Sequence, residues 1–343
     1  MRILHVVSSL NVGGAERFVI DLAVQQKNAM GIDVGVISMG LNGEPLEGEV
    51  RCADINLHLA TQTSKIRSIL KCYDVVHIHS SHCLLRVLLS AVLLPIKIVY
   101  TRHNEVVHQG LKWKFVYMLA SIMLTKIIFV AEKAKQNYLE KYPHYRKKTL
   151  TILNGVLPIE KNNNESPMFN LGHVGRFVPL KSQHVLIEAV ALLPVTVQQK
   201  ITISFYGTGE LMGKNKALAV SLIPDVLVNF RGFEANRNVI YNSFDALIVT
   251  SKTEGLSLAI FEAFASGTPV IASNVGGNPE LVINHSNGFL YDYGDSQSLA
   301  NNIEKLATNN DIYQNFSEKC SQRYHEHFSM EICANNHLSV YKK

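Results

Sequence analysis

Short runs of β-branched residues alternate along the whole chain with segments of helical periodicity, and this alternation constrains the fold more than any other feature. Strands joined by helical crossovers form parallel sheets with helices on both faces. Twelve strands are predicted, at residues 2–8, 33–40, 74–80, 96–103, 126–131, 150–156, 171–176, 201–207, 226–232, 245–251, 269–275 and 288–292. Helical periodicity is clearest at residues 15–30, 183–193, 256–266 and 299–308. The sequence therefore predicts an α/β protein with doubly wound parallel sheets.

The strands divide into two groups of six, and the best linker in the chain lies between the groups. Residues 157–170 hold two prolines and the polar run Lys-Asn-Asn-Asn-Glu-Ser. We expect two Rossmann-like domains, at residues 1–157 and 158–323. Ligands of such sheets bind beyond the carboxyl ends of the strands, so two facing domains are expected to share a cleft.

Composition narrows the class of protein. With 47% apolar and 18% charged residues, the chain can bury sizeable cores, which excludes disordered and fibrous classes. The longest apolar stretch, residues 84–100, is interrupted by Arg86, Pro95 and Lys97, so no transmembrane helix is expected. The N-terminus has the pattern of a buried strand rather than a signal peptide. Five scattered cysteines suit a reducing compartment, and we expect a cytoplasmic protein.

Charge is unevenly distributed within the net +5 of the chain. Residues 1–157 carry 19 Lys/Arg against 11 Asp/Glu, whereas the remaining residues carry 14 against 17. The basic half favours an anionic partner or membrane surface, and a solvated basic face is the alternative. Because no arginine-rich stripe or aromatic platform accompanies the charge, no nucleic-acid partner is expected.

A glycine pair follows the first predicted strand, in the sequence Gly13-Gly14-Ala15-Glu16. Glycines at a strand-to-helix turn let the backbone approach a ligand closely. The third glycine of a dinucleotide fingerprint is missing and no acidic residue ends the second strand, so a nicotinamide cofactor is not expected. A plain turn without a ligand is the alternative interpretation.

Two cations, Arg176 and Lys181, lie in the loop after the first predicted strand of the second half. An arginine can bind two phosphate oxygens at once and a lysine supplies a mobile point charge, so the two can converge on one diphosphate. Basic loop residues are usually solvated, and the pattern alone is weak.

Two carboxylates follow the fourth predicted strand of that half. Glu254 lies in the loop before the next helix, and the backbone amides of Leu256, Ser257 and Leu258 form a helix N-terminus suited to phosphate. Glu262 follows two helical turns along, where its carboxylate can accept hydrogen bonds from ribose hydroxyls. The apolar residues around Glu262 argue against a solvated surface glutamate.

In their order and spacing these motifs resemble the retaining glycosyltransferases of family 4, which have the GT-B fold of two Rossmann-like domains facing across a cleft. The match runs through most of the chain and also includes Asp74-Val75-Val76-His77-Ile78-His79, Thr101-Arg102-His103-Asn104, Asn154-Gly155-Val156, Gly207-Thr208-Gly209 and Gly276-Gly277-Asn278-Pro279-Glu280. The chain departs from the family pattern at Leu157, where an acidic residue is frequent, and at Ser182, where glycine or asparagine is frequent. In similar proteins the C-terminal segment, here residues 324–343, packs back on the N-terminal domain.

The resemblance implies a site for the donor diphosphate. Arg176 and Lys181 would neutralise its charge, which grows as the glycosidic bond breaks, together with the amides of residues 256–258. Gly14 would let the backbone approach from the N-terminal domain. The family works without a metal, and no Asp-x-Asp triplet is present to hold one, so no cofactor is expected.

Contacts to the sugar, ribose and base are also implied by the resemblance. His103 and Glu254 would be the catalytic residues at the donor sugar, where His103 orients hydroxyls and stabilises positive charge at the anomeric centre. Glu262 would bind the ribose, while Gly207 and Phe233 would flank the base. Similar enzymes lack the nucleophile and acid pair of retaining hydrolases, so the leaving diphosphate would take the acceptor proton in a front-face substitution.

Two further features have competing interpretations. His77, His79 and His82 look like a metal cluster, but strand alternation puts only the first two on one face, and a metal site is not expected. Residues 113–124, with lysines on either side, form either a core helix or an amphipathic helix lying on a bilayer. An interfacial helix would favour a lipid-linked acceptor.

Together these observations predict a retaining, metal-independent hexosyltransferase. It would move a sugar from a nucleotide-diphosphate donor, a UDP-sugar rather than a GDP-sugar, to a lipid-linked or growing surface polysaccharide. Peripheral association with the inner face of the cell membrane is expected through the basic N-terminal domain. The alternatives are a catalytically inactive module that binds nucleotide-sugars and a GT-B nucleotide-sugar epimerase.

Overall fold

The computed structural model describes residues 1–103, 110–161 and 167–342. Its elements fall into two compact units, one formed by Met1–Gly155 with Met330–Lys343 and the other by Val156–Ser329. Asn104, the last residue of the Thr-Arg-His-Asn motif, and residues 162–166 of the expected linker lie outside the described residues.

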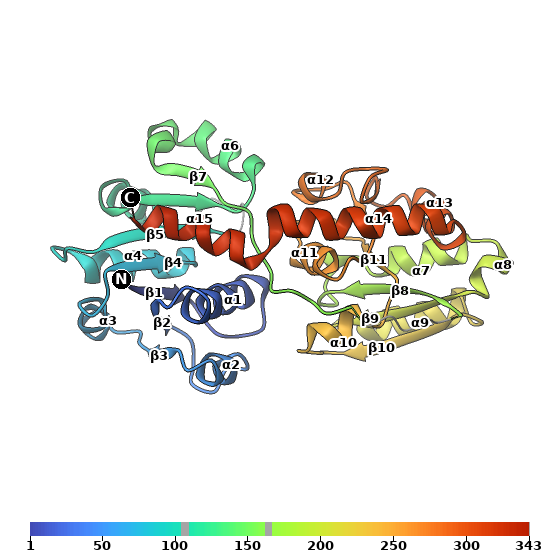
Figure 1. Ribbon diagram of the computed structural model, residues 1–343, viewed down its shortest axis with the longest axis horizontal. Coiled ribbons are helices and arrows are strands. Elements are labelled where there is room, and N and C mark those ends of the chain that lie inside the picture. The colour runs from blue at the N-terminus through green and yellow to red at the C-terminus, as the bar shows by residue number, and fades with distance from the viewer. Residues whose placement is uncertain (104–109, 162–166, 343) are drawn as a thin grey trace. The chain divides into compact units, whose positions relative to one another are not determined.

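The first unit contains a seven-stranded parallel sheet in the order β3-β2-β1-β4-β5-β6-β7 (Figure 1). Its strands are β1 (Arg2–Val7), β2 (Asp33–Ser38), β3 (Asn56–Leu59), β4 (Val75–Ile78), β5 (Lys97–Arg102), β6 (Lys126–Phe129) and β7 (Thr149–Thr151). Its helices are α1 (Gly14–Asn28), α2 (Glu47–Cys52), α3 (Thr63–Leu70), α4 (Ser81–Ala91), α5 (Leu111–Met123), α6 (Glu132–Lys141), the 3-10 helix Pro143–Lys148 and α15 (Met330–Lys342). Adjacent side chains of β1 such as Ile3 and Leu4 are both fully buried, because helices cover both faces of a parallel sheet.

The one strand of this sheet that the sequence did not predict is β3. It alternates polar and apolar residues, pairs only with β2 at the sheet edge and is half-buried. An edge strand needs no continuous apolar run, which was the signal that identified the other strands.

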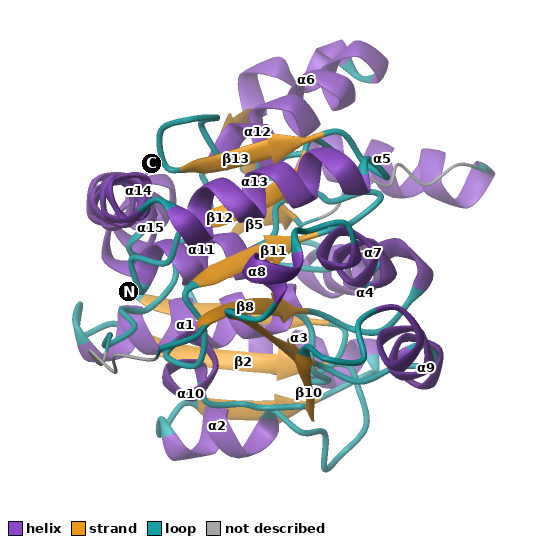
Figure 2. Ribbon diagram, turned by 90° about the vertical axis from the view of Figure 1, so that its right-hand side faces the viewer, coloured by secondary structure: helices purple, strands orange, loops and turns teal. Residues whose placement is uncertain are grey.

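The second unit contains a six-stranded parallel sheet in the order β10-β9-β8-β11-β12-β13, with helices on both faces (Figure 2). Its strands are β8 (Phe169–Val174), β9 (Ile201–Tyr206), β10 (Leu227–Gly232), β11 (Ala246–Val249), β12 (Val270–Ser273) and β13 (Gly288–Tyr291). Its helices are α7 (His184–Ala191), α8 (Val195–Gln198), α9 (Met212–Leu222), α10 (Arg237–Tyr241), α11 (Leu258–Ala265), α12 (Asn278–Leu281), α13 (Ser296–Thr308) and α14 (Asn310–Arg323), with the 3-10 turn Pro179–Lys181 and the π-helical turn Tyr324–Phe328.

Both sheets reverse their winding direction at a central strand, β1 in the first unit and β8 in the second. In the first sheet β1 lies between β2 and β4. In the second sheet β8 lies between β9 and β11. The carboxyl ends of the strands at such a reversal are where doubly wound sheets bind ligands. The predicted fold, two Rossmann-like domains, is confirmed.

The units divide at residues 155 and 329, whereas the sequence placed the domain ends at 157 and 323. The backbone N–H of Val156 donates to the carbonyl of Phe328 at 3.0 Å, and the Tyr324 hydroxyl donates to the Val156 carbonyl at 3.3 Å. These bonds tie residues 324–329 to the second unit. Helix α15, at the red end of the chain in Figure 1, belongs to the first unit and packs on α1.

Helix α5 has one buried and one exposed apolar face. Val116, Tyr117 and Ala120 are buried. Four apolar side chains on its other face are exposed by 47–85%: Leu111, Phe115, Met118 and Ile122. Core packing therefore explains the apolar residues on only one face of this helix. No helix among the described residues is long and apolar enough to cross a membrane.

Candidate active site

The carboxyl ends of β8 and β11 bring together two of the predicted site residues. Lys181 follows β8 and its Nζ forms an ion pair with Oε1 of Glu254, which follows β11. The Ser251 hydroxyl donates to the same carboxylate oxygen at 2.7 Å. Only 26% of the Lys181 side chain and 11% of the Glu254 side chain are exposed, so little water screens the pair. The two motifs that the sequence separates meet at the winding reversal of the sheet.

The backbone of Lys181 is fixed by the residues around it. Ser182 adopts a left-handed conformation with φ of 47°, which favours glycine or asparagine, and its hydroxyl donates to the Pro179 carbonyl at 3.0 Å. The Thr250 hydroxyl donates to the Lys181 carbonyl at 2.7 Å and lies 3.0 Å from Nε2 of His173. The departure from the family pattern at Ser182 thus preserves the backbone conformation that the usual residues favour.

Two glycine motifs press against the loops that carry Arg176 and Glu254. Gly207 has φ of +128°, and a Cβ there would lie 2.2 Å from the carbonyl oxygen of Gly175. Gly276 has φ of +55°, and a Cβ there would lie 1.7 Å from the carbonyl oxygen of Glu254. Any side chain at either position would displace a loop of the site. That Gly207 flanks the base stays a prediction.

Helix α11 positions Glu262 and the predicted phosphate cradle. The helix begins at Leu258 with Ser257 as its N-cap, two residues after the expected start at Leu256. The Glu262 carboxylate is buried, accepts a hydrogen bond from the Tyr241 hydroxyl at 2.7 Å and lies 3.8 Å from the Arg237 guanidinium. Burial, reinforced by Glu262, raises the pKa of Tyr241 well above its ordinary value.

Tyr241 and Arg237 were not identified from the sequence. Both lie on the short helix α10, whose residues carry no motif. Their place in the site is seen only from their contacts with Glu262 on α11. By contrast, Arg176 and Phe233 occupy exposed positions after β8 and β10, where a guanidinium and an aromatic ring are open to a ligand.

In the first unit, Gly14 is the first residue of α1 and His103 directly follows β5. One turn into α1, the ring of Phe18 lies 5.3 Å from the His103 ring, centroid to centroid. Nε2 of His103 is 3.1 Å from Nδ1 of His79. Burial lowers the pKa of His103 to about 3, so its imidazole is neutral at physiological pH.

His103 borders a cluster of buried histidines whose membership differs from the one the sequence indicated. His77 and His79 lie on one strand face, as alternation predicted, with ring centroids 3.9 Å apart. The third member is His5 on β1, which pairs in register with His77 on β4. Nitrogens of these three rings lie within 4.8 Å of one another. His82 is instead exposed on α4, because the strand ends before it.

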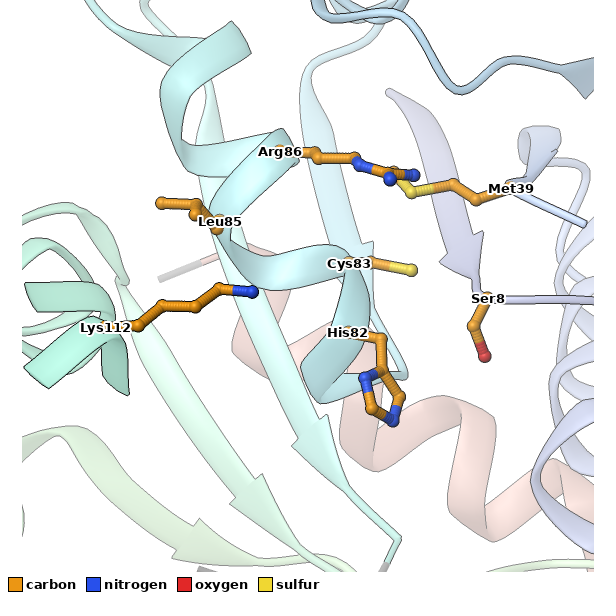
Figure 3. Close-up of a pocket in the computed structure, with 7 residues that line it drawn as sticks. All are labelled: Ser8, Met39, His82, Cys83, Leu85, Arg86 and Lys112. Carbon is orange, nitrogen blue, oxygen red and sulfur yellow. The ribbon is translucent and has the colours of Figure 1, made fainter. Parts of the chain in front are cut away.

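A pocket of about 300 Å³ lies in the first unit, beyond the carboxyl ends of β1 and β2 and beside the start of α4 (Figure 3). Its lining residues are Ser8, Met39, His82, Cys83, Leu85, Arg86 and Lys112. The two cations, Arg86 and Lys112, come from α4 and α5. A pocket with two cations and no carboxylate in its lining suits an anionic or polar ligand.

Family comparisons cover nearly the whole chain. Residues 12–158 match the model of Glycosyltransferase Family 4, and residues 158–323 match the model of Glycosyl transferases group 1. The boundary between the two matches falls in the expected linker.

Curated relatives are similar over part of their length. The lipopolysaccharide core biosynthesis glycosyltransferase LpsE of Rhizobium meliloti is 29% identical over 49% of this chain and 48% of its own. Spore coat protein SA of Bacillus subtilis is 26% identical over 64% of this chain and 65% of its own. The matched segments thus span about half of LpsE and just under two thirds of spore coat protein SA.

Among solved structures, Anabaena HepE in complex with UDP and glucose superimposes with a TM-score of 0.86. The likeness covers 100% of both chains at 21% sequence identity. At this identity the likeness shows the fold.

Proposed function

The chain belongs to the GT-B glycosyltransferases of family 4 and group 1, and from this premise we propose that it transfers a sugar from a nucleotide-diphosphate donor to a glycan acceptor, with retention of anomeric configuration and without a metal ion. The observation that carries the proposal is the contact between Lys181 and Glu254 at the ends of β8 and β11. A cation and a carboxylate side by side match the two parts of a nucleotide-sugar, the diphosphate and the sugar hydroxyls.

Lys181 acts on the diphosphate, together with the exposed Arg176 and the free amides at the start of α11. Negative charge on the diphosphate increases as the bond to the sugar breaks. Fixed cations and helix amides therefore bind the transition state more strongly than the ground state, which lowers the barrier. These groups supply the positive charge that a divalent ion supplies in other transferases, and this supports a metal-free reaction.

Glu254 and His103 act at the sugar. The Glu254 carboxylate accepts hydrogen bonds from sugar hydroxyls with the oxygen sites that Lys181 and Ser251 leave available. His103 is neutral, so it contributes a hydrogen bond or a lone pair rather than a charge. The departing diphosphate takes the acceptor proton in a front-face substitution, so no protein nucleophile is required.

UDP is the nucleotide we favour, since the similar HepE binds UDP. Thermal stabilisation by UDP, GDP, ADP, CMP and TDP, each alone and as a common sugar conjugate, tests the donor class. We expect a shift in melting temperature with UDP compounds that is lost in Lys181→Ala. A shift with another diphosphate would reassign the donor. Binding without turnover toward any glycan acceptor would identify an inactive nucleotide-sugar-binding module instead.

The acceptor we propose is a lipid-linked or growing surface polysaccharide, and the pocket between α4 and α5 supports it. Arg86 and Lys112 line the pocket and suit an acceptor that carries an anionic group, such as the phosphate of a lipid carrier. Arg86→Ala should then raise the KM for a phosphorylated acceptor and leave the Kd for the donor unchanged. An unchanged acceptor KM would remove the pocket from acceptor binding.

We also propose that the protein acts at the inner face of the cell membrane. The exposed apolar face of α5 and the neighbouring Lys112 and Lys114 have the character of a helix that lies in a lipid interface. Anionic lipids would attract the basic first unit, which brings the enzyme to a lipid-linked acceptor.

A further inference from the structure

The buried histidines of the first unit form a directed hydrogen-bond chain that ends at His103. We propose that Gln26 is a positioning residue which determines, through His5 and His79, which ring nitrogen of His103 carries the proton. The proposal rests on the proposed role of His103 at the donor sugar. It assigns a function to three buried polar residues that no step of the proposed reaction otherwise uses.

The chain is continuous from α1 to the end of β5. Oε1 of Gln26 lies 2.8 Å from Nε2 of His5, and Nδ1 of His5 lies 2.9 Å from Nε2 of His79. Nδ1 of His79 lies 3.1 Å from Nε2 of His103. Gln26 and His5 are fully buried and His79 is 5% exposed, so water does not compete for these bonds. Each link has the geometry of a hydrogen bond between uncharged groups.

A carbonyl oxygen at one end fixes the direction of every bond in the chain. Oε1 of Gln26 only accepts, so Nε2 of His5 carries the proton and its Nδ1 is an acceptor. Nε2 of His79 must then donate to His5, which leaves Nδ1 of His79 as the acceptor. Consequently Nε2 of His103 donates to His79, and Nδ1 of His103 presents a lone pair.

These bond directions require that each imidazole in the chain carries one proton. Burial lowers the pKa of His5 to about 4 and that of His103 to about 3, and the pKa of His79 lies well below its ordinary value for the same reason. The neighbouring rings of His77 and His337 lower the pKa of His79 further. All three rings in the chain are therefore neutral at physiological pH.

The Gln26 amide is oriented by its bond to His5. Its Oε1 accepts from Nε2 of His5 at 2.8 Å, whereas its Nε2 is buried and has no hydrogen-bond partner among the described residues. The Tyr341 hydroxyl on α15 lies 2.6 Å from Nδ1 of His77, the neighbour of His5 in the sheet.

A metal ion is the competing use for this cluster, and the hydrogen bonds argue against it. His77 has protein partners at both nitrogens, the hydroxyls of Tyr341 and Thr101, each at 2.6 Å. His5 and His79 also have partners at both nitrogens. An ion bound by all three rings would break at least two of these bonds, whereas the hydrogen-bond chain keeps them all.

The tautomer matters for the reaction. A lone pair on Nδ1 of His103 accepts a hydrogen bond from a sugar hydroxyl and faces developing positive charge favourably. The opposite tautomer would present an N–H there, which repels that charge. Gln26 thus selects the form of His103 that is useful at an anomeric centre, although the glutamine touches neither substrate.

Nitrogen NMR of the protein with ¹⁵N-labelled histidine tests the proposal without any substrate. The chemical shifts of the two ring nitrogens distinguish the tautomers, and the His103 signals are those lost in His103→Gln. We expect the Nε2–H tautomer at His103 in the wild type and a mixture of both tautomers in Gln26→Met, which keeps the side-chain volume and removes the amide. Gln25→Met, the same substitution one position earlier on α1, should leave the tautomer unchanged.

An Nδ1–H tautomer at His103 in the wild type would overturn the proposal, and so would an unaltered tautomer in Gln26→Met. In steady-state assays we expect kcat of Gln26→Met to fall about tenfold with little change in the KM for the donor, as is common when a residue that orients a histidine is removed. An unchanged kcat beside an altered tautomer would overturn the link to catalysis. If no glycosyl transfer is detected in the wild type, the proposed function fails, and the NMR result still decides the hydrogen-bond chain.

Discussion

Lys181 and Glu254 form an ion pair although they lie 73 residues apart in the sequence. The cation proposed for the diphosphate is thus in contact with the carboxylate proposed for the sugar. A diphosphate bound at Lys181, as proposed, would compete with Glu254 for the ammonium, and the Ser251 hydroxyl, at 2.7 Å from the same carboxylate oxygen, would still hold Glu254 in place. The proposal therefore couples donor binding to the placement of Glu254.

Replacement of Lys181 by alanine should lower turnover at least about a hundredfold, which corresponds to ~2.7 kcal/mol of lost transition-state stabilisation. The side chain is partly exposed, so the fold should remain and the circular dichroism spectrum should not change. Steady-state rates of nucleotide release measure the effect. Lys252→Ala, which removes an exposed cation near the same loop, is the matched control and should keep the normal rate. Near-normal turnover in Lys181→Ala would take this residue out of the mechanism.

Glu254→Ala should also lower turnover at least about a hundredfold, because the sugar loses its hydrogen-bond acceptor near the reacting carbon. The freed Lys181 still binds the diphosphate, so the Kd for UDP should rise little or even fall. Calorimetric titration with UDP and rate measurements separate the two effects. Glu318→Ala, at an exposed position on α14, should alter neither quantity. A large loss of UDP affinity with retained turnover would contradict the assignment of Glu254 to the sugar.

The sequence predicted the parts of the site that follow from local pattern. Strand periodicity placed Lys181 and Glu254 at carboxyl ends, and adjacency of β8 and β11 made them neighbours. Partners from elements without motifs could not be predicted in this way: Tyr241 reaches Glu262 from α10. His5, by contrast, could have been identified from the sequence. A parallel register between the first and third predicted strands puts it opposite His77.

Activity should be unaffected by a metal chelator. In the proposed site Lys181, Arg176 and the amides of α11 would supply the positive charge at the diphosphate, so a divalent ion would not be needed. The initial rate of transfer is measured with and without EDTA. The acceptor preparation must contain no metal ions. Loss of activity in EDTA that added Mg²⁺ or Mn²⁺ restores would contradict the metal-free reaction.

Liposomes that contain anionic lipid should carry the protein upward in a density gradient at low salt. The exposed apolar side chains of α5, including Phe115 and Ile122, follow one another at helical spacing and would enter the lipid interface. High salt should weaken flotation because it screens the basic first unit. Phe115→Glu combined with Ile122→Glu should abolish flotation, whereas Val220→Glu, at an exposed apolar position on α9, should not. Protein that stays at the bottom of the gradient at low salt would refute the membrane proposal.

The buried histidines should make the first unit less stable in mild acid. Burial lowers the pKa of His5 and His337 to about 4 and that of His103 to about 3, from an ordinary value of 6.5. Between pH 6.5 and 4 the unfolded chain therefore binds protons at these rings that the folded chain does not bind. Stability rises with pH wherever the unfolded state binds more protons, so it should fall as the pH drops from 6.5 toward 4.

Urea unfolding followed by the fluorescence of Trp113, the single tryptophan of the chain, measures this dependence at pH 7.5, 6.0 and 5.0. Trp113 lies on α5 and reports on the unit that holds the histidines. His337→Asn should flatten the dependence, since unfolding then takes up about one proton fewer in this window. His144→Asn, which removes an exposed ring of the same unit, should leave it unchanged. Equal unfolding free energies at pH 6.0 and 5.0 in the wild type would mean that the cluster already binds protons when folded, and the neutral hydrogen-bond chain to His103 would then be wrong.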